Sequence, residues 1–302
     1  MKTIAGLLIL LTVLSMLFLM ALSFNTASAT NPETDETPAS HTSPSSSAPV
    51  RVAYLTFDDG PSRNVTTGIL DLLYEEGIQA TFFVLPMDGL DDVYLRIINE
   101  GHELANHSYS HNYNRLYTKS VESFIEDVKK LHSFILYRFD YTMTSFRFPG
   151  GPFGFPTSVF DERRAALRGI GYREFAWHVD PSDYTPKVIA MSGEELASRV
   201  LSEVSGLGNK NHVILLFHDR DVNRSTLKAL PFVIAGLRQR GFTFDTVGNF
   251  PLTRADIRAY EEHQRATVTT RTAGIRLGLF RSKLFEESVE NLNHRTGQLL
   301  FE

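Results

Sequence analysis

Two histidines lie four residues apart in segment 103–114, which reads ELANHSYSHNYN. Imidazole is a common metal ligand, and this spacing would place two side chains on one side of a helical turn. Surface histidines also occur at this spacing by chance, so His107 and His111 alone do not separate a metal site from an ordinary polar turn. The chain has no cysteine. Any further ligand must therefore be histidine, aspartate or glutamate.

Other ionisable residues follow short apolar runs. TFDDGPS places Asp58 and Asp59 after one run, and RFPGG, DPSDY and FHDRD contribute Arg147, Asp183 and His218. Each has an ordinary alternative, since Asp and Gly favour tight turns, an arginine can pair with a surface acid, and a histidine can be hydrogen-bonded in a core. If the runs are parallel strands, however, all these groups meet at one rim. A metal-dependent site is the interpretation that accounts for them together.

Strand-like and helix-like runs alternate over about 200 residues, which predicts a parallel sheet with crossover helices. The expected strands are 52–57, 80–85, 102–106, 145–148, 172–177, 212–217 and 242–247. The expected helices are 65–77, 91–100, 118–138, 160–169, 193–205 and 225–240. Seven strands suit a barrel slightly smaller than an eight-stranded one, with reactive groups at the carboxyl ends of the strands. An open, doubly wound sheet is the alternative from periodicity alone.

The two ends of the chain differ from this pattern. Residues 1–29 predict a signal peptide cleaved after Ala29, although the apolar run 4–24 is also long enough for an uncleaved membrane anchor. Residues 30–49 are rich in Ser, Thr and Pro and predict a flexible linker. We therefore expect one extracellular catalytic domain over 50–252. Residues 253–302 form a C-terminal extension to which we assign no role.

Composition restricts the partners. The chain of 302 residues is 42% hydrophobic, as in globular proteins, and has a net charge of −5. A nucleic-acid-binding domain would show a basic patch or stripe, so we expect no nucleic-acid partner. We expect a monomer that contacts a membrane only through the N-terminal anchor, if that segment is retained.

Five short motifs, in order, resemble those of the polysaccharide deacetylases of the NodB-homology type, carbohydrate esterase family 4. They are TFDDG (56–60), HSYSH (107–111), RFPGG (147–151), DPSDY (180–184) and LFH (216–218). The resemblance covers about 50–250 and implies a distorted (β/α)7 barrel that removes acetyl groups from a polysaccharide. Two positions depart from the family. Gly150 stands where the family often has an aromatic residue, which leaves a more open or differently shaped cleft, and Tyr184 stands where Trp is commoner.

Together, the resemblance and the residue types predict a site with a divalent metal held by Asp59, His107 and His111. Two histidines and one carboxylate, with room for water, suit Zn²⁺, and Co²⁺ and Mn²⁺ are the alternatives. Such a metal lowers the pKa of a water molecule and polarises a carbonyl group.

The remaining groups complete a scheme for amide hydrolysis. We expect Asp58 to be the general base, oriented by Arg147, and His218 to be the general acid, with its pKa raised by Asp183. The Gly150 N–H is expected in the oxyanion site, and Leu216 and Tyr184 are expected to line the pocket for the acetyl methyl group.

The expected substrate is an N-acetylated glycan, first the N-acetylglucosamine of peptidoglycan. Chitin oligomers, N-acetylmuramic acid, exopolysaccharide and acetyl-xylan are alternatives. A non-catalytic glycan-binding domain is a further alternative, but such a relative should lack at least one reactive residue, and all are present.

Overall fold

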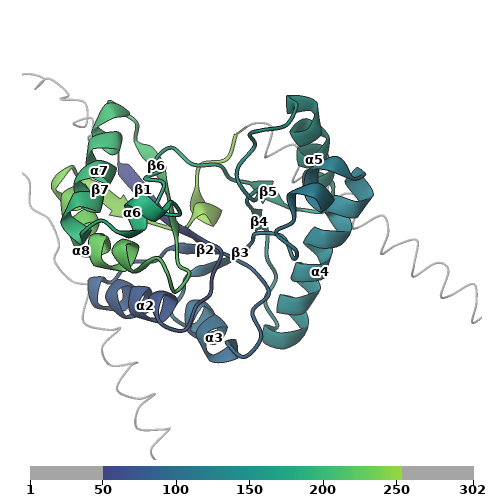
Figure 1. Ribbon diagram of the computed structural model, residues 1–302, viewed down its shortest axis with the longest axis horizontal. Helices are drawn as coiled ribbons and strands as arrows, with labels where there is room; N and C mark the ends of the chain where they lie inside the picture. The colour runs from purple at the N-terminus through teal and green to yellow at the C-terminus, as the bar shows by residue number, and fades with distance from the viewer. Residues whose placement is uncertain (1–49, 254–302) are drawn as a thin grey trace, which may run out of the picture. The chain divides into compact units, whose positions relative to one another are not determined.

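The computed structural model describes residues 50–253 (Figure 1). The expected signal peptide or anchor, the linker, and the C-terminal extension beyond residue 253 lie outside the described residues. Among the described helices, none is both long and apolar enough to cross a membrane.

The described residues form one seven-stranded parallel sheet. The strands run in the order β5-β4-β3-β2-β1-β6, and β7 also pairs with β1. Each expected run forms a strand, so the parallel-sheet prediction is confirmed, although β4 and β5 have two residues each. The bounds are β1 Arg51–Asp58, β2 Thr81–Val84, β3 Glu103–Asn106, β4 Ser145–Phe146, β5 Arg173–Glu174, β6 His212–His218 and β7 Phe242–Phe244.

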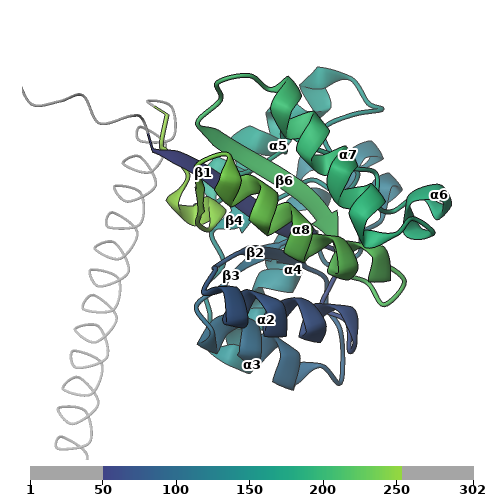
Figure 2. The same ribbon diagram turned by 90° about the vertical axis from the view of Figure 1, so that its left-hand side faces the viewer.

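Helices lie around the outside of this sheet (Figures 1 and 2). The six expected helices are all present within a few residues of their predicted bounds. They are α2 Val65–Glu76, α3 Asp91–Asn99, α4 Val121–Phe139, α5 Thr157–Gly169, α7 Gly193–Gly206 and α8 Arg224–Gln239. Three short elements were not predicted, namely a π-helix at Asn114–Thr118, α6 at Pro186–Ile189 and a 3₁₀-helix at Val247–Asn249. They are too short for a periodic pattern to reveal.

Alternation along the strands separates two faces. On β1, the apolar side chains of Ala53, Leu55 and Phe57 belong to the large core shared with the helices. Tyr54 belongs to a smaller cluster on the other face, formed largely by strand residues. Thr56 and Asp58 alternate with the core residues as Tyr54 does, so their side chains lie on the same face of the sheet as Tyr54. We call this face, which carries Tyr54, Thr56 and Asp58 of β1, the inner face.

The sheet curls, and its two ends meet irregularly. The segment that follows β5 returns to β6 through a parallel bridge between Val179 and Leu215. The His178 N–H also donates to the Ile214 carbonyl at 2.8 Å. The result is a curled, distorted (β/α)7 barrel with helices on its outer face. The alternative of an open, doubly wound sheet, which needs helices on both faces, is wrong.

Candidate active site

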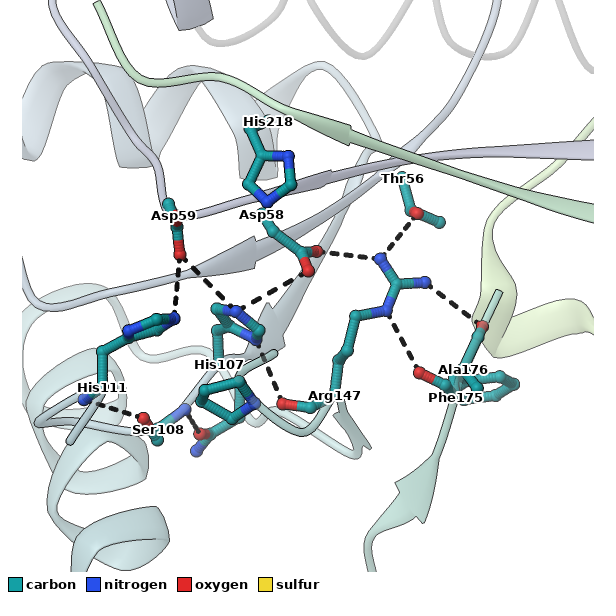
Figure 3. Close-up of polar contacts among 12 residues, drawn as sticks. Thr56, Asp58, Asp59, His107, Ser108, His111, Arg147, Phe175, Ala176 and His218 are labelled. Atoms are coloured by element: carbon teal, nitrogen blue, oxygen red, sulfur yellow. Dashed lines mark hydrogen bonds and ion pairs between the residues drawn. The ribbon is translucent and has the colours of Figure 1, made fainter. Parts of the chain in front are cut away.

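Strand register brings the reactive groups together at the carboxyl ends of the strands. Asp58, the last residue of β1, is paired in register with His218, the last residue of β6. His107 directly follows β3, and Arg147 directly follows β4. Figure 3 shows these side chains facing one another. Asp59 comes immediately after β1, as parallel-barrel geometry predicts.

Asp59, His107 and His111 meet the geometric requirements of a metal site. Their donor atoms all lie within 4.8 Å of one another. The Asp59 Oδ1 atom is 3.5 Å from His107 Nε2 and 3.3 Å from His111 Nε2 (Figure 3). Ligands about 2.05 Å from a tetrahedral Zn²⁺ lie about 3.4 Å apart. Asp59 Oδ1 is also buried without a hydrogen-bond partner, which a cation would supply. The three residues thus fit a divalent cation.

A backbone carbonyl holds His107 in the form that a metal requires. The His107 Nδ1 atom lies 3.0 Å from the carbonyl oxygen of Arg147. Because a carbonyl can only accept, Nδ1 carries the proton and Nε2 presents its lone pair to the cluster. Burial lowers the pKa of His107 to about 3, despite the opposing charge of Asp59. The ring is therefore neutral at physiological pH.

The loop between the two histidines is irregular, so the helical-turn interpretation of their spacing is wrong. Ser108 and His111 both have positive φ, at 72° and 47°. Side chains stabilise this path. Asn106 Oδ1 accepts the Ser108 N–H at 2.8 Å, and Ser108 Oγ accepts the His111 N–H at 3.1 Å. Backbone in such sparsely populated conformations persists only where its surroundings hold it.

Asp127 of α4 also stabilises this loop through hydrogen bonds to its backbone. Its buried Oδ1 accepts the N–H groups of Tyr109 and Ser110 at 2.7 and 3.0 Å. Its Oδ2 accepts from Arg115 Nε at 2.9 Å. Asp127 is not recognisable from the sequence, because a single acid in an amphipathic helix is typical of a solvated position.

Asp58 and Arg147 form a buried ion pair on the inner face. Arg147 Nη1 donates to Asp58 Oδ1 at 2.8 Å and to Thr56 Oγ at 2.7 Å. Its Nε donates to the Phe175 carbonyl, and its Nη2 donates to the Ala176 carbonyl (Figure 3). Burial raises the pKa of Asp58, and Arg147 opposes this rise without cancelling it. Arg147 thus orients Asp58, but it does not lower the net pKa of that carboxyl group.

The adjacent residues Asp58 and Asp59 take different directions because Asp59 has a φ of 73°. Asp58 continues the inner face of β1 toward Arg147, while Asp59 turns toward the histidines (Figure 3). Asp and Asn tolerate this left-handed conformation better than most residues. One turn therefore directs two adjacent carboxylates toward different neighbours.

His218 and Asp183 form a second buried pair. His218 Nδ1 donates to Asp183 Oδ1 at 2.7 Å, and the His218 backbone N–H donates to Asp183 Oδ2 at 2.9 Å. Thr226 Oγ also donates to Oδ2, at 2.6 Å. Burial lowers the pKa of His218, but the hydrogen bond and charge of Asp183, aided by Asp58 and Asp59, outweigh burial and raise the pKa to about 9. His218 is thus held protonated, with Nε2 left to donate.

The three predicted pocket residues differ in exposure. Leu216 is buried and shares the inner-face parity of His218. Tyr184 is 47% exposed, and its ring centroid lies 5.4 Å from that of His218. Gly150 has a φ of 70°, a conformation that favours glycine. Its N–H makes no hydrogen bond within residues 50–253.

Asp219 was also missed. It is fully buried beside the turn that carries Asp59, and a Cβ added to Gly60 would meet its carboxylate. Thr66 Oγ donates to its Oδ2 at 2.6 Å, while its Oδ1 has no partner among the described residues. Burial raises the pKa of Asp219 to about 7, and Asp58 and Asp59 add to this rise. The sequence does place Asp219 close to the site, since it directly follows His218 in FHDRD.

Known proteins of one family are similar to this chain. The profile of the family described as polysaccharide deacetylase matches residues 45–173. A peptidoglycan-N-acetylglucosamine deacetylase of Bacillus cereus is 30% identical over 203 residues, covering 65% of this chain and 86% of that protein. The peptidoglycan-N-acetylglucosamine deacetylase PgdA of Listeria monocytogenes is 28% identical over 195 residues, but the alignment covers 64% of this chain and only 37% of that longer protein.

A solved structure is similar over most of its length. The catalytic domain of peptidoglycan N-acetylglucosamine deacetylase from Eubacterium rectale is 29% identical, with a TM-score of 0.58. The match covers 70% of this chain and 95% of that structure.

Proposed function

The chain belongs to the polysaccharide deacetylase family, and from this premise we propose that it is a metal-dependent hydrolase of N-acetyl groups on peptidoglycan N-acetylglucosamine. One observation carries the proposal. The Asp59, His107 and His111 donor atoms lie beside a carboxylate that can accept a proton, Asp58, and near a histidine held protonated, His218. Amide hydrolysis needs these groups at one carbonyl.

Asp59, His107 and His111 would hold the divalent cation, through Asp59 Oδ1 and the Nε2 atoms of the histidines. When bound, such a cation lowers the pKa of a water molecule and polarises the acetyl carbonyl. Zn²⁺ is our first choice, since two histidine nitrogens and one carboxylate oxygen are a ligand set that it commonly takes. Co²⁺ and Mn²⁺ accept the same nitrogen and oxygen ligands.

Asp58 would take the proton of the attacking water at Oδ2, the oxygen that Arg147 leaves free. Arg147 fixes the carboxylate plane through Oδ1, so that the free oxygen faces the metal-binding residues. His218 would then donate its Nε2 proton to the departing amine nitrogen. Asp183 keeps His218 charged and holds its ring orientation through the 2.7 Å bond to Nδ1.

The Gly150 N–H would hydrogen-bond the oxygen that becomes negative in the transition state. Leu216 and Tyr184 would enclose the acetyl methyl group. Since the Gly150 contribution comes from the backbone, the loss of an aromatic side chain at this position does not remove the donor.

The choice of peptidoglycan is supported by the names of the Bacillus cereus relative and of the Eubacterium rectale structure. It also accords with the expected N-terminal signal or anchor, which would place the enzyme outside the cell membrane, at the cell wall.

Acetate release tests the proposal directly. The full chain would be incubated with peptidoglycan, chitin oligomers and acetyl-xylan, with and without a chelator. We expect the most acetate from peptidoglycan, its loss on chelation, and its recovery on adding Zn²⁺ or Co²⁺. If no substrate yields acetate after either metal is restored, the proposed function is wrong. A higher rate on chitin oligomers or acetyl-xylan would change the substrate but keep the chemistry.

A further inference from the structure

Tyr113 lies immediately before the π-helix Asn114–Thr118, two residues after the metal-binding residue His111. Its ring centroid lies 5.7 Å from that of His111 and 5.8 Å from that of Tyr117. Tyr117 is buried, and its hydroxyl donates to the Pro149 carbonyl at 2.7 Å. Tyr113 is therefore supported by a ring that is tied to the RFPGG turn, yet 45% of it is exposed.

The Tyr113 hydroxyl occupies the space beside Gly150 that a side chain at position 150 would take. A Cβ built on Gly150 would come much closer than 3.0 Å to the hydroxyl oxygen, which non-bonded atoms do not tolerate. Glycine at 150 is thus needed both for its positive φ and for the approach of this tyrosine. An aromatic group therefore does lie beside position 150, but it comes from the loop after β3 and not from residue 150 itself.

The Tyr113 hydroxyl makes no hydrogen bond within the described part of the chain. A phenolic hydroxyl can both donate and accept a hydrogen bond, so this one is available to a ligand. Tyr184 is 47% exposed, and its ring centroid lies 5.4 Å from that of His218. One half-exposed tyrosine thus lies against a metal-binding histidine, and another lies against the acid.

We propose that Tyr113 is a substrate-binding residue that contacts the sugar bearing the acetamido group, its ring against the apolar face of that sugar and its hydroxyl donating to a sugar oxygen. A tyrosine with one apolar face and one free polar tip suits a sugar, which also presents C–H and O–H groups. The contact is to the sugar and not to the reacting carbonyl. It therefore stabilises the bound substrate and the transition state equally, and its loss raises KM while leaving kcat unchanged.

This inference rests on the proposed deacetylase function, and Tyr113→Phe tests it. Acetate release from chitin tetramer and from peptidoglycan would be followed with the full, Zn²⁺-loaded chain. Losing one hydrogen bond should raise KM about 3- to 10-fold, with kcat within about twofold of the wild type. Tyr113→Ala, which also removes the ring, should raise KM further. Tyr137→Phe is the matched control, because Tyr137 is 86% exposed on α4, and its KM should equal that of the wild type.

A double-mutant cycle with Gly150→Ala tests the contact itself. In the wild-type background the added methyl group displaces the Tyr113 hydroxyl, so KM should rise at least as much as in Tyr113→Phe. In the Tyr113→Ala background the strain at the positive φ of Gly150 remains but the clash with the hydroxyl does not, so Gly150→Ala should raise KM by a smaller factor than it does in the wild-type background.

The outcomes distinguish the role of Tyr113 from the deacetylase function itself. If the wild type releases acetate but Tyr113→Phe keeps the wild-type KM, or lowers kcat alone, the role assigned to Tyr113 is wrong and the deacetylase function stands. Equal effects of Gly150→Ala in both backgrounds would likewise overturn that role. If the wild type releases no acetate from any N-acetylated glycan, the function fails and the inference falls with it.

Discussion

Replacing Asp183 by Asn should move the alkaline limb of the pH–rate profile to lower pH. Asp183 accepts from His218 Nδ1 at 2.7 Å, and its charge is among the main contributions that raise the pKa of His218 from 6.5 to about 9 against the effect of burial. Asn keeps the size of the side chain but removes the charge, so burial should bring the pKa back to 6.5 or lower. A general acid works in its protonated form, so activity is lost as the pH rises through this pKa.

The size of the effect follows from the two pKa values. At pH 8, a group with a pKa of 9 is about 90% protonated, and one with a pKa of 6.5 is about 3% protonated. The rate should therefore fall about 30-fold at pH 8 but only about 4-fold at pH 7. A divalent cation at Asp59 opposes part of the rise and brings the wild-type limb below 9, without changing the direction of the displacement.

The assay is kcat/KM for acetate release between pH 5 and 10, for the wild type and Asp183→Asn. Asp180→Asn is the matched control, since this acid lies in the same loop but makes its hydrogen bond to the Ser182 N–H. A profile of Asp183→Asn that is lowered equally at all pH values, with its alkaline limb in place, would refute the acid role of His218.

Three further predictions concern the metal and the turn after β1. Asp58→Asn should reduce turnover by at least about 100-fold, while metal binding, measured by calorimetry, stays largely intact. His107→Ala should lose both turnover and metal binding. Full metal affinity in His107→Ala would contradict its role as a ligand. Zn²⁺ at about 100 times its Kd should raise the free energy of unfolding by about 2.7 kcal/mol in a denaturant titration, and a value unchanged by the metal would argue against a site in the folded state. Gly60→Ala should lower the free energy of unfolding by about 1–3 kcal/mol, because its methyl group meets the buried Asp219 carboxylate. Gly206→Ala is the control, because a Cβ at this position meets no other atom. Equal unfolding midpoints for the two variants would refute the clash.

Most of the fold could be predicted because its elements repeat a long, regular pattern. The helix α4 and the strand β6 carry enough apolar residues at their own period to be recognised without any tertiary information. The π-helix at Asn114–Thr118 could not be predicted, since five residues carry no period. The closure of the barrel through Val179 and Leu215 was also unpredictable, because a single bridge between distant segments leaves no local signal.

The residue types of the candidate site could be predicted from the sequence, but the hydrogen bonds that hold its loops could not. Asp59, His107 and His111 stand at predicted strand ends, and parallel topology alone implies that they meet. The helical interpretation of HSYSH failed because Asn106 and Asp127 hold the loop in another path. Both act through hydrogen bonds to backbone N–H groups, which the order of residues along the chain does not reveal.

By itself, the sequence determined which groups are available to the candidate site: a carboxylate and two histidines that could bind a metal, and a second carboxylate and a third histidine that could transfer protons. It determined this because residue type sets which atoms can bind a cation or transfer a proton. Only the tertiary structure decided where these groups lie and which protonation states they take. Burial and neighbouring charges, which come from segments far apart in the chain, keep His107 neutral and His218 protonated. Tyr113 takes the place beside Gly150 for the same reason, since a contact between two loops exists only once the strands that carry them are side by side.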